Sequence, residues 1–319
     1  MNPHGLWRTL RSWLPFASLV LAAALPCMQS NAHAAPPGAL IVIIAQTDDP
    51  VHQQALGAFA ATLSAHPPAP RIETRAPQDA DAATLATATL IVTFGSAGAG
   101  AGLGTSTPVI HALLSRATLD ALQRAPGHGP HTALILDQPP ARQIALLRAA
   151  LPEFDRLATL HSPDMDGAAA ELGAAARAQG VALHAIRIEE EHELYPGLRA
   201  ALERPAVLVS LPDTHVFNRY TVQNVLMTAY RLHAPVLGHS AALVRAGATL
   251  GLYTTPVQAG QEAARLAARV LDGAPLPPTS TPQLFEVGVN ATVARALGLN
   301  LPTAEALTRA LIEAEEAAR

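Results

Sequence analysis

Short apolar runs alternate with amphipathic stretches along most of the chain. Residues 39–46 (ALIVIIAQ) are nearly all apolar, with β-branched residues at the centre, and such a run predicts a strand buried on both faces of a parallel sheet. The Asp49-Pro50 pair that follows is typical of a helix start, and we expect that helix over residues 51–64. The same unit then repeats, so the pattern predicts an α/β fold.

Further apolar runs have the length and composition of strands. They lie at residues 90–94, 108–112, 132–136, 156–161, 181–188, 206–211, 235–239, 249–253 and 285–289. Amphipathic stretches predict helices over residues 142–151, 167–179, 198–202, 216–232, 257–271 and from residue 291 onward. Because strands and helices alternate, we expect crossover connections and mainly parallel sheets.

The first 34 residues have the three parts of a secretory signal peptide. Arg8 and Arg11 form a basic start, residues 14–25 are almost entirely apolar, and Ala32-His33-Ala34 supplies the small residues that a cleavage site requires. This apolar stretch is well short of the ~20 residues that span a bilayer. We therefore expect cleavage after Ala34 and export to the periplasm.

Cys27 is the single cysteine of the chain. Lipidation at Cys27 is not expected, because Pro26 is a poor fit to the small residue that precedes a lipidated cysteine. Cleavage after Ala34 leaves no cysteine, which excludes disulfides and thiol chemistry in the exported protein. A periplasmic protein without disulfides is expected to rely on a large apolar core.

Composition narrows the classes of function. The length after cleavage suggests two domains at roughly 150 residues each, and a chain that is 50% hydrophobic and 14% charged can build a sizeable core. The formal net charge of −4, with no basic stripe, argues against nucleic-acid binding. The sequence contains no lysine, which excludes Schiff-base and P-loop chemistry.

Two motif-like segments suggest enzymatic or nucleotide chemistry but match it incompletely. Gly95–Gly104 (GSAGAGAGLG) fits the dinucleotide pattern G-x-G-x-x-G in no register, and a turn with a short helix start is the better interpretation. Gly238–Ala242 (GHSAA) resembles a nucleophile elbow around Ser240, but Ala242 replaces its last glycine and no histidine follows His239. No catalytic residue is therefore assigned, and a serine hydrolase at Ser240 stays an alternative. The histidines are too scattered for a metal site, and no cofactor is expected.

Several aspartates lie at the predicted carboxyl ends of strands. They are Asp48, Asp49, Asp137 and Asp213. Ligands of open parallel sheets bind beyond these ends, where an aspartate can either pair with an ammonium group or cap a helix. The loops after residues 46, 94, 136, 211 and 253 are the places where a site is expected.

The order of several segments resembles a known family. Leu211–Asn218 (LPDTHVFN), Pro235–Gly238 (PVLG), Val244–Ala248 (VRAGA) and Tyr253 follow one another, and Asp137-Gln138-Pro139 lies upstream. In these segments the chain resembles the ABC transporter substrate-binding proteins of the tryptophan/tyrosine type. The resemblance extends over nearly the whole chain after residue 34 and is weakest over residues 67–89.

The resemblance implies a type I periplasmic-binding-protein architecture, with two Rossmann-like lobes joined by three crossovers. After a signal peptide over residues 1–34, we expect an N-terminal lobe over residues 35–138, to which residues 256–283 return. The C-terminal lobe is expected over residues 139–255 together with residues 284–319.

By position, the resemblance also implies a set of ligand-binding residues. They are Thr47, Asp48, Gly95, Ser96, Asp137, Gln138, Asp213, Thr214, Phe217 and Tyr253. The hydroxyl groups of this set are expected to hold a carboxylate or similar acceptor, Asp213 or Asp48 an ammonium, and Tyr253 the ligand body. Only 4% of the residues are aromatic, so tryptophan and tyrosine are not carried over as ligands.

The expected function is therefore that of a periplasmic, monomeric solute-binding protein of an ABC importer. It would trap a small polar, amino acid-like molecule between its lobes by hinge closure and deliver it to a permease in the inner membrane. A sensory protein that uses the same fold to report ligand occupancy to a receptor is the main alternative, and enzymatic activity is not expected.

Overall fold

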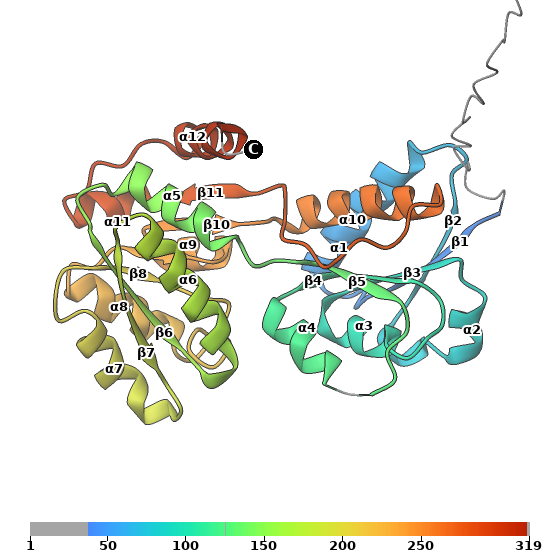
Figure 1. The fold of residues 1–319 in the computed structure, drawn as a ribbon, viewed down its shortest axis with the longest axis horizontal. Helices are drawn as coiled ribbons and strands as arrows, with labels where there is room; N and C mark the ends of the chain where they lie inside the picture. Colours follow the sequence, from blue (N-terminus) through green and yellow to red (C-terminus); the bar gives the residue numbers. More distant parts are fainter. Residues whose placement is uncertain (1–37, 125, 318–319) are drawn as a thin grey trace, which may run out of the picture. The chain divides into compact units, whose positions relative to one another are not determined.

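The computed structural model describes residues 38–124 and 126–317. The predicted signal peptide and Cys27 lie outside these residues. Within the described residues, strands alternate with helices along the chain. The strands form two separate sheets (Figure 1). The predicted α/β fold with mainly parallel sheets is confirmed.

The first sheet is parallel throughout and has the strand order β2-β1-β3-β4-β5. Its strands are β1 (Leu40–Ile44), β2 (Arg71–Arg75), β3 (Leu90–Phe94), β4 (Val109–Leu114) and β5 (His131–Ile135). The intervening helices are α1 (Pro50–Ser64), η1 (Pro77–Asp79), α2 (Ala82–Ala86), α3 (Gly95–Gly102) and α4 (Arg116–Gln123).

The second sheet has the order β11-β10-β9-β8-β6-β7 and is parallel except for β11, which runs antiparallel to β10. Its strands are β6 (Arg156–His161), β7 (Ala182–Arg187), β8 (Val207–Val209), β9 (Val236–Gly238), β10 (Leu250–Tyr253) and β11 (Glu286–Val289). The helices from here to the end are α5 (Pro140–Ala150), η2 (Pro163–Met165), α6 (Asp166–Ala178), η3 (Glu191–Glu193), α7 (Leu194–Ala201), α8 (Val222–Arg231), α9 (Ala241–Ala246), α10 (Pro256–Leu271), α11 (Ala291–Ala296) and α12 (Ala304–Ala317).

Helix α10 follows β10 of the second sheet in sequence, yet it packs on the first sheet beside α1 (Figure 1). The two helices approach closely at Gly260, where an added Cβ atom would lie 2.2 Å from the Ala55 carbonyl oxygen. Ala263 and Ala267 of α10 join the same buried core as Phe59. The first core is therefore completed by a segment from late in the chain.

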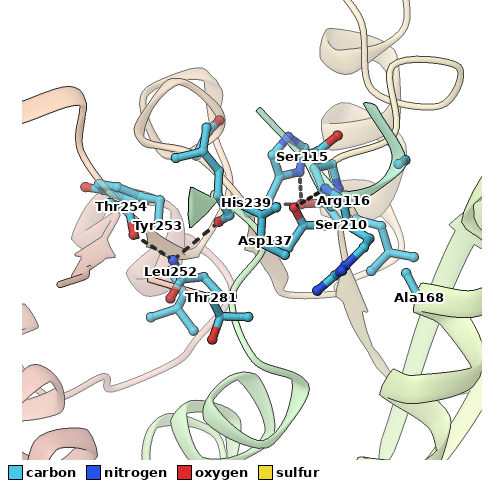
Figure 2. Close-up of a pocket in the computed structure, with 18 of the residues that line it drawn as sticks. Ser115, Arg116, Asp137, Ala168, Ser210, His239, Leu252, Tyr253, Thr254 and Thr281 are labelled. Carbon is cyan, nitrogen blue, oxygen red and sulfur yellow. Dashed lines mark hydrogen bonds between the residues drawn. The ribbon is translucent and has the colours of Figure 1, made fainter. Parts of the chain in front are cut away.

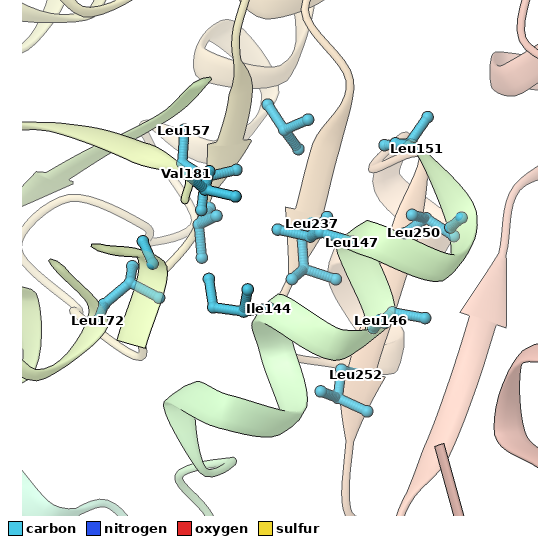
Figure 3. Close-up of a cluster of buried hydrophobic side chains, with 14 of the residues drawn as sticks. Ile144, Leu146, Leu147, Leu151, Leu157, Leu172, Val181, Leu237, Leu250 and Leu252 are labelled. Atoms are coloured by element: carbon cyan, nitrogen blue, oxygen red, sulfur yellow. The ribbon is translucent and has the colours of Figure 1, made fainter. Parts of the chain in front are cut away.

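The second sheet has its own core, in which α5 supplies a large share of the apolar surface (Figure 3). Ile144 and Leu147 are fully or almost fully buried together with Leu157, Leu237 and Leu250. Burial of each such side chain stabilises the fold by about 1.5–3 kcal/mol. Helix α12 covers α5 and β11 from the outside.

Three segments connect the elements of the first sheet with those of the second: residues 136–139, residues 254–255 and the stretch before β11. Buried Arg142 of α5 joins two of them, donating to Gln138 Oε1 at 2.8 Å and to the Pro282 carbonyl at 3.0 Å, and Gln138 Nε2 donates to Thr254 of the third. Its Nε also meets Glu315 Oε1 of α12 at 2.5 Å. The Thr254 hydroxyl donates to the Leu284 carbonyl at 2.7 Å, so the connecting segments form one hydrogen-bonded group.

The structure corrects the sequence prediction in several elements. Strand β2 was not predicted because its sequence, RIETR, carries charges instead of an apolar run, as suits a strand at the edge of a sheet. Helices α2, α4 and α9 were also missed. Helix α8 begins at Val222, not at residue 216, because Asn218 and Thr221 close a turn in which the Thr221 hydroxyl donates to the Val216 carbonyl at 2.7 Å.

Candidate functional site

A cavity of about 710 Å³ is lined by residues at the ends of strands of the two sheets and by the first residues of the helices that follow them. From the first sheet come the segments after β4 and β5, and from the second the segments after β8, β9 and β10 (Figure 2). Val51 and Gln54 of α1 and the start of α6 complete the lining. These segments follow the carboxyl ends of parallel strands, the position at which open α/β sheets bind ligands.

Asp137 follows β5 and lines the cavity. Its Oδ2 accepts a hydrogen bond from the Arg116 backbone N–H at 2.8 Å, whereas Oδ1 accepts none from any other residue in the described part of the chain. Burial is the main cause that raises the pKa of Asp137 above its usual value. A partly buried carboxylate with one oxygen free of hydrogen bonds to other described residues is suited to a cationic ligand group.

Gln138 also lines the cavity, but its side-chain amide is already engaged. Oε1 accepts from Arg142 Nη1, and Nε2 donates to Thr254 Oγ1 at 2.9 Å. The amide thus links two of the connecting segments. In this arrangement Gln138 supports the site from behind and has no free amide group for a ligand.

Ser210 and His239 form one wall of the cavity, at the ends of β8 and β9 (Figure 2). Ser210 Oγ lies 3.0 Å from His239 Nδ1 and also accepts from the His239 backbone N–H at 3.0 Å. Phe217 packs edge-on against the imidazole, with ring centroids 6.0 Å apart. Burial lowers the pKa of His239 to about 4, so its ring is neutral at neutral pH.

Tyr253 is the one tyrosine in the lining, at the end of β10. Its ring lies over two glycines, Gly251 on the same strand and Gly288 opposite on β11, because a Cβ atom at either would come within 3.1 to 3.3 Å of ring atoms. The glycines leave the space that the ring occupies. Burial, followed by the nearby Glu286 carboxylate, raises the pKa of the phenol.

Charged side chains of α4, α6, α9 and η2 complete the lining. They are Arg116, Asp120, Asp164, Glu171 and Arg245. With Asp137, the lining holds four carboxylates against two guanidinium groups, although Asp164 also meets Arg124, outside the lining, at 3.3 Å. The sequence analysis singled out none of these five. Arg116, Asp120 and Arg245 were missed because α4 and α9 were not recognised as helices that begin at the cavity.

Asp213 was expected to face a ligand, but the structure gives it an internal role. It is 5% exposed and outside the cavity lining. Oδ2 accepts from the Ser162 backbone N–H at 2.6 Å and Oδ1 from that of His215 at 2.9 Å. The carboxylate thus joins the loop after β6 to the loop after β8.

The other predicted residues also lie outside the lining. Phe217 is a core residue behind His239, and Thr214 is exposed. Thr47 and Asp48 are exposed in the loop after β1. These four residues, with Gly95 and Ser96, are therefore not brought together with Asp137, Gln138 and Tyr253.

The loop after β3 is shaped by local packing. Gly95 has φ +77°, and a Cβ atom there would lie 2.7 Å from His52 Nε2. His52 Nδ1 in turn accepts from the Gln46 backbone N–H at 3.0 Å. The glycine-rich segment continues as α3, in agreement with the predicted turn and helix start, and Ser96 is exposed.

Ser240 shows the geometry of a helix cap. Its Oγ accepts from the Leu243 backbone N–H at 3.3 Å at the start of α9, and no histidine in the described residues bonds to it. Among the same residues, no three His, Cys, Asp or Glu side chains are grouped so that they could bind a metal ion. No helix in the described ranges combines the length and hydropathy that a bilayer crossing requires.

Comparison with solved structures identifies proteins of similar fold. A conserved domain protein from Vibrio cholerae is 18% identical with a TM-score of 0.59, over 85% of this chain and 97% of that one. The ABC domain from Streptococcus pneumonia in complex with L-Trp is 17% identical with a TM-score of 0.58, over 85% and 98%. The ligand-free, open structure of a substrate binding protein with adhesive properties from Clostridium difficile is 17% identical with a TM-score of 0.63, over 84% and 97%.

Comparison with curated proteins finds no match. Comparison with family descriptions finds one that matches residues 133–311, more than half of the chain. That family is described as ABC transporter substrate binding protein, and the chain belongs to it.

Proposed function

We propose that this protein binds a small, polar, amine-bearing molecule of the amino acid type in the described cavity and delivers it to an ABC importer. Substrate-binding proteins of this family are extracytoplasmic, bind a small molecule and serve an ABC permease. The observation that carries the proposal is the cavity of about 710 Å³ at the carboxyl ends of strands from both sheets.

The charge of the lining supports an amine as the recognised group. Carboxylates outnumber guanidinium groups there, and Asp137 keeps one oxygen free of contacts with other described residues. Solved structures of similar fold include a glucose-galactose binding protein from Geobacillus stearothermophilus as well as the L-Trp complex. A sugar hydroxyl can also donate to a carboxylate, but an ammonium in addition supplies the positive charge that balances the excess of carboxylates in the lining.

We further propose that the two sheets are the cores of two lobes that close around the ligand. The network of Gln138, Arg142 and Thr254 joins the three connecting segments at their centre. Ligand contacts from both sheets would shift the population toward the closed arrangement, since only that arrangement makes both sets of contacts.

A thermal-shift screen followed by calorimetry tests the function. The panel contains the standard amino acids, short peptides, sugars and organic acids. We expect an amino acid or a related amine to raise the melting temperature, because a ligand at 100 times its Kd stabilises the native state by about 2.7 kcal/mol. Binding of a sugar alone, or of an organic acid without an amine, would contradict the proposed ligand class.

Export is tested separately. We propose that the leader is removed after Ala34, so the periplasmic protein begins at Ala35. Amino-terminal sequencing of protein from a periplasmic extract checks this. A product that keeps residues 1–34 would contradict the proposed processing.

A further inference from the structure

We infer that His239 selects the ligand, by donating a hydrogen bond from imidazole Nε2 to an oxygen atom that the ligand carries in addition to its amine. The inference rests on the proposed function and narrows it. An amine with a carboxylate or carbonyl oxygen, such as an amino acid or an amino amide, satisfies both groups. A simple alkylamine leaves His239 without a partner.

The position of His239 is the first argument. It lies in the cavity lining at the end of β9 (Figure 2), and its Nε2 bonds to no residue in the described part of the chain. Since Nε2 has no hydrogen-bond partner among the described residues and is not one of their fully buried unpaired polar atoms, it is exposed to solvent in the cavity. Nδ1, by contrast, is engaged with Ser210.

The hydrogen bonds of Ser210 allow the ring proton to lie on Nε2, and the inference takes this tautomer. Ser210 is buried, and its Oγ already accepts from the His239 backbone N–H. Among the described residues, the acceptor within reach of its hydroxyl hydrogen is His239 Nδ1, at 3.0 Å. If that hydrogen is donated to Nδ1, the neutral imidazole carries its own proton on Nε2.

The ring is held in place before any ligand arrives. Ser210 contacts the ring through one hydrogen bond at Nδ1 and the His239 backbone N–H through another, and Phe217 packs against the ring edge-on. A donor fixed in this way loses little freedom when it binds an acceptor. Burial keeps the ring neutral at neutral pH, so it neither repels the ligand's amine nor requires an anionic partner.

The test uses two substitutions that separate the ring nitrogens. In His239→Asn the amide oxygen takes the place of Nδ1 and can still accept from Ser210 Oγ, but nothing reaches the place of Nε2. In His239→Gln the amide nitrogen extends to the place of Nε2. His233→Asn is the matched control, because His233 is exposed, lies outside the lining and has φ +53°, which asparagine tolerates.

Calorimetry first measures the standard amino acids with the parent protein, and then the primary amine that lacks the carboxyl group of the tightest one. We expect that amine to bind the parent at least tenfold more weakly than the amino acid. His239→Asn should lower the affinity for the amino acid about tenfold, as for the loss of about 1.4 kcal/mol, and leave that for the amine unchanged. His239→Gln should recover part of the loss, and His233→Asn should match the parent.

The outcomes separate the inference from the function. If the amino acid binds His239→Asn as tightly as the parent, with both proteins folded by circular dichroism, the inference is wrong while the proposed function stands. Equal loss for the amine and the amino acid would also overturn it, because a general distortion of the cavity would then explain the effect. If no amino acid binds the parent, the proposed function fails and the inference with it.

Discussion

The two sheets contribute to the cavity from different places in their strand order. In the first sheet, the lining comes mainly from β4 and β5, which stand together at one edge. In the second, it comes from β8, β9 and β10, which lie inside the sheet. The strand end after β3 carries the exposed Ser96, outside the lining, whereas the segment after β1 reaches the lining only with Val51 and Gln54 of α1. A strand's carboxyl end therefore belongs to the site only if its place in the sheet order brings it to the other sheet.

Two aspartates show the same difference at the level of single residues. Asp137 and Asp213 each follow a buried strand and each accept a backbone hydrogen bond. Asp213 uses both oxygens within the second sheet's loops, whereas Asp137 keeps one open to the cavity. Similar sequence positions are therefore used inside the protein in one case and left open to the cavity in the other.

The largest expected effect, on the free energy of unfolding, concerns α10, which packs against α1 on the first sheet although it follows the second sheet's β10 in sequence. Gly260→Ala would place a Cβ atom 2.2 Å from the Ala55 carbonyl oxygen, and we expect a loss of about 3 kcal/mol from overpacking. Gly57→Ala on α1 is the control, because nothing lies within 4 Å of its Cβ position; it should stabilise the protein by up to about 1 kcal/mol. Urea denaturation measures both, and equal stabilities would show that α1 and α10 are less closely packed than described.

Asp213→Ala is the next largest. It removes a buried acceptor of two backbone N–H groups, and we expect a loss of about 1.5–3 kcal/mol of unfolding free energy. Asp48→Ala, at an exposed position, should change stability by less than about 0.5 kcal/mol. A variant with unchanged stability but lost ligand affinity would restore the ligand-binding role that the sequence suggested for Asp213.

Asp137→Asn should act on affinity, with a loss of tenfold or more for an amine-bearing amino acid, which corresponds to about 1.4 kcal/mol. Because burial raises the pKa of Asp137, the wild-type carboxyl takes up its proton at a higher pH than an ordinary aspartate. Wild-type affinity should therefore fall as the pH is lowered through that raised pKa, while the affinity of Asp137→Asn should lack this contribution.

The same shift has a consequence for stability without ligand. A raised pKa means that the folded state binds the proton more tightly than the unfolded state, so Asp137 lowers stability as the pH rises from the usual pKa to the raised one. Asp137→Asn should remove that decrease. Calorimetric titrations and urea denaturation at several pH values measure the two effects, and parallel pH profiles for both proteins would contradict the assignment.

The smallest effect is expected for the ion pair between α4 and η2. Arg124 and Asp164 meet at 3.3 Å, but their side chains are 66% and 72% exposed. Arg124→Ala should therefore cost less than about 1 kcal/mol, and salt should reduce even this difference. A larger, salt-resistant loss in urea denaturation would show that this contact matters more to the arrangement of the two sheets than its exposure suggests.

The fold was largely predictable from the sequence because buried parallel strands are continuous apolar runs. Strands such as Leu90–Phe94 and Arg156–His161 were placed at their true bounds for this reason. The edge strand Arg71–Arg75 lacks that signal, and the short helices α4 and α9 are too brief to show a clear period. The sequence analysis therefore missed elements that are polar or short and found the apolar strands that build the two cores.

The candidate site was predictable only in part. Asp137, Gln138 and Tyr253 were placed near the ligand, and all three line the cavity. The sequence could not show that Asp213 accepts a hydrogen bond from the Ser162 backbone N–H, 51 residues away, because that contact depends on the order of β6 and β8 in the sheet. Nor could it show that His239 and Ser210 face each other, since they meet only through the pairing of β8 with β9.

The bond between Arg142 and Glu315 has a practical consequence. Glu315 lies in the last turns of α12, and Arg142, the cation it neutralises, is 4% exposed. A truncation that removes Glu315 would leave the buried guanidinium group of Arg142, beside Gln138, without its carboxylate partner. Engineered sensors built on this protein should therefore keep α12 through Glu315.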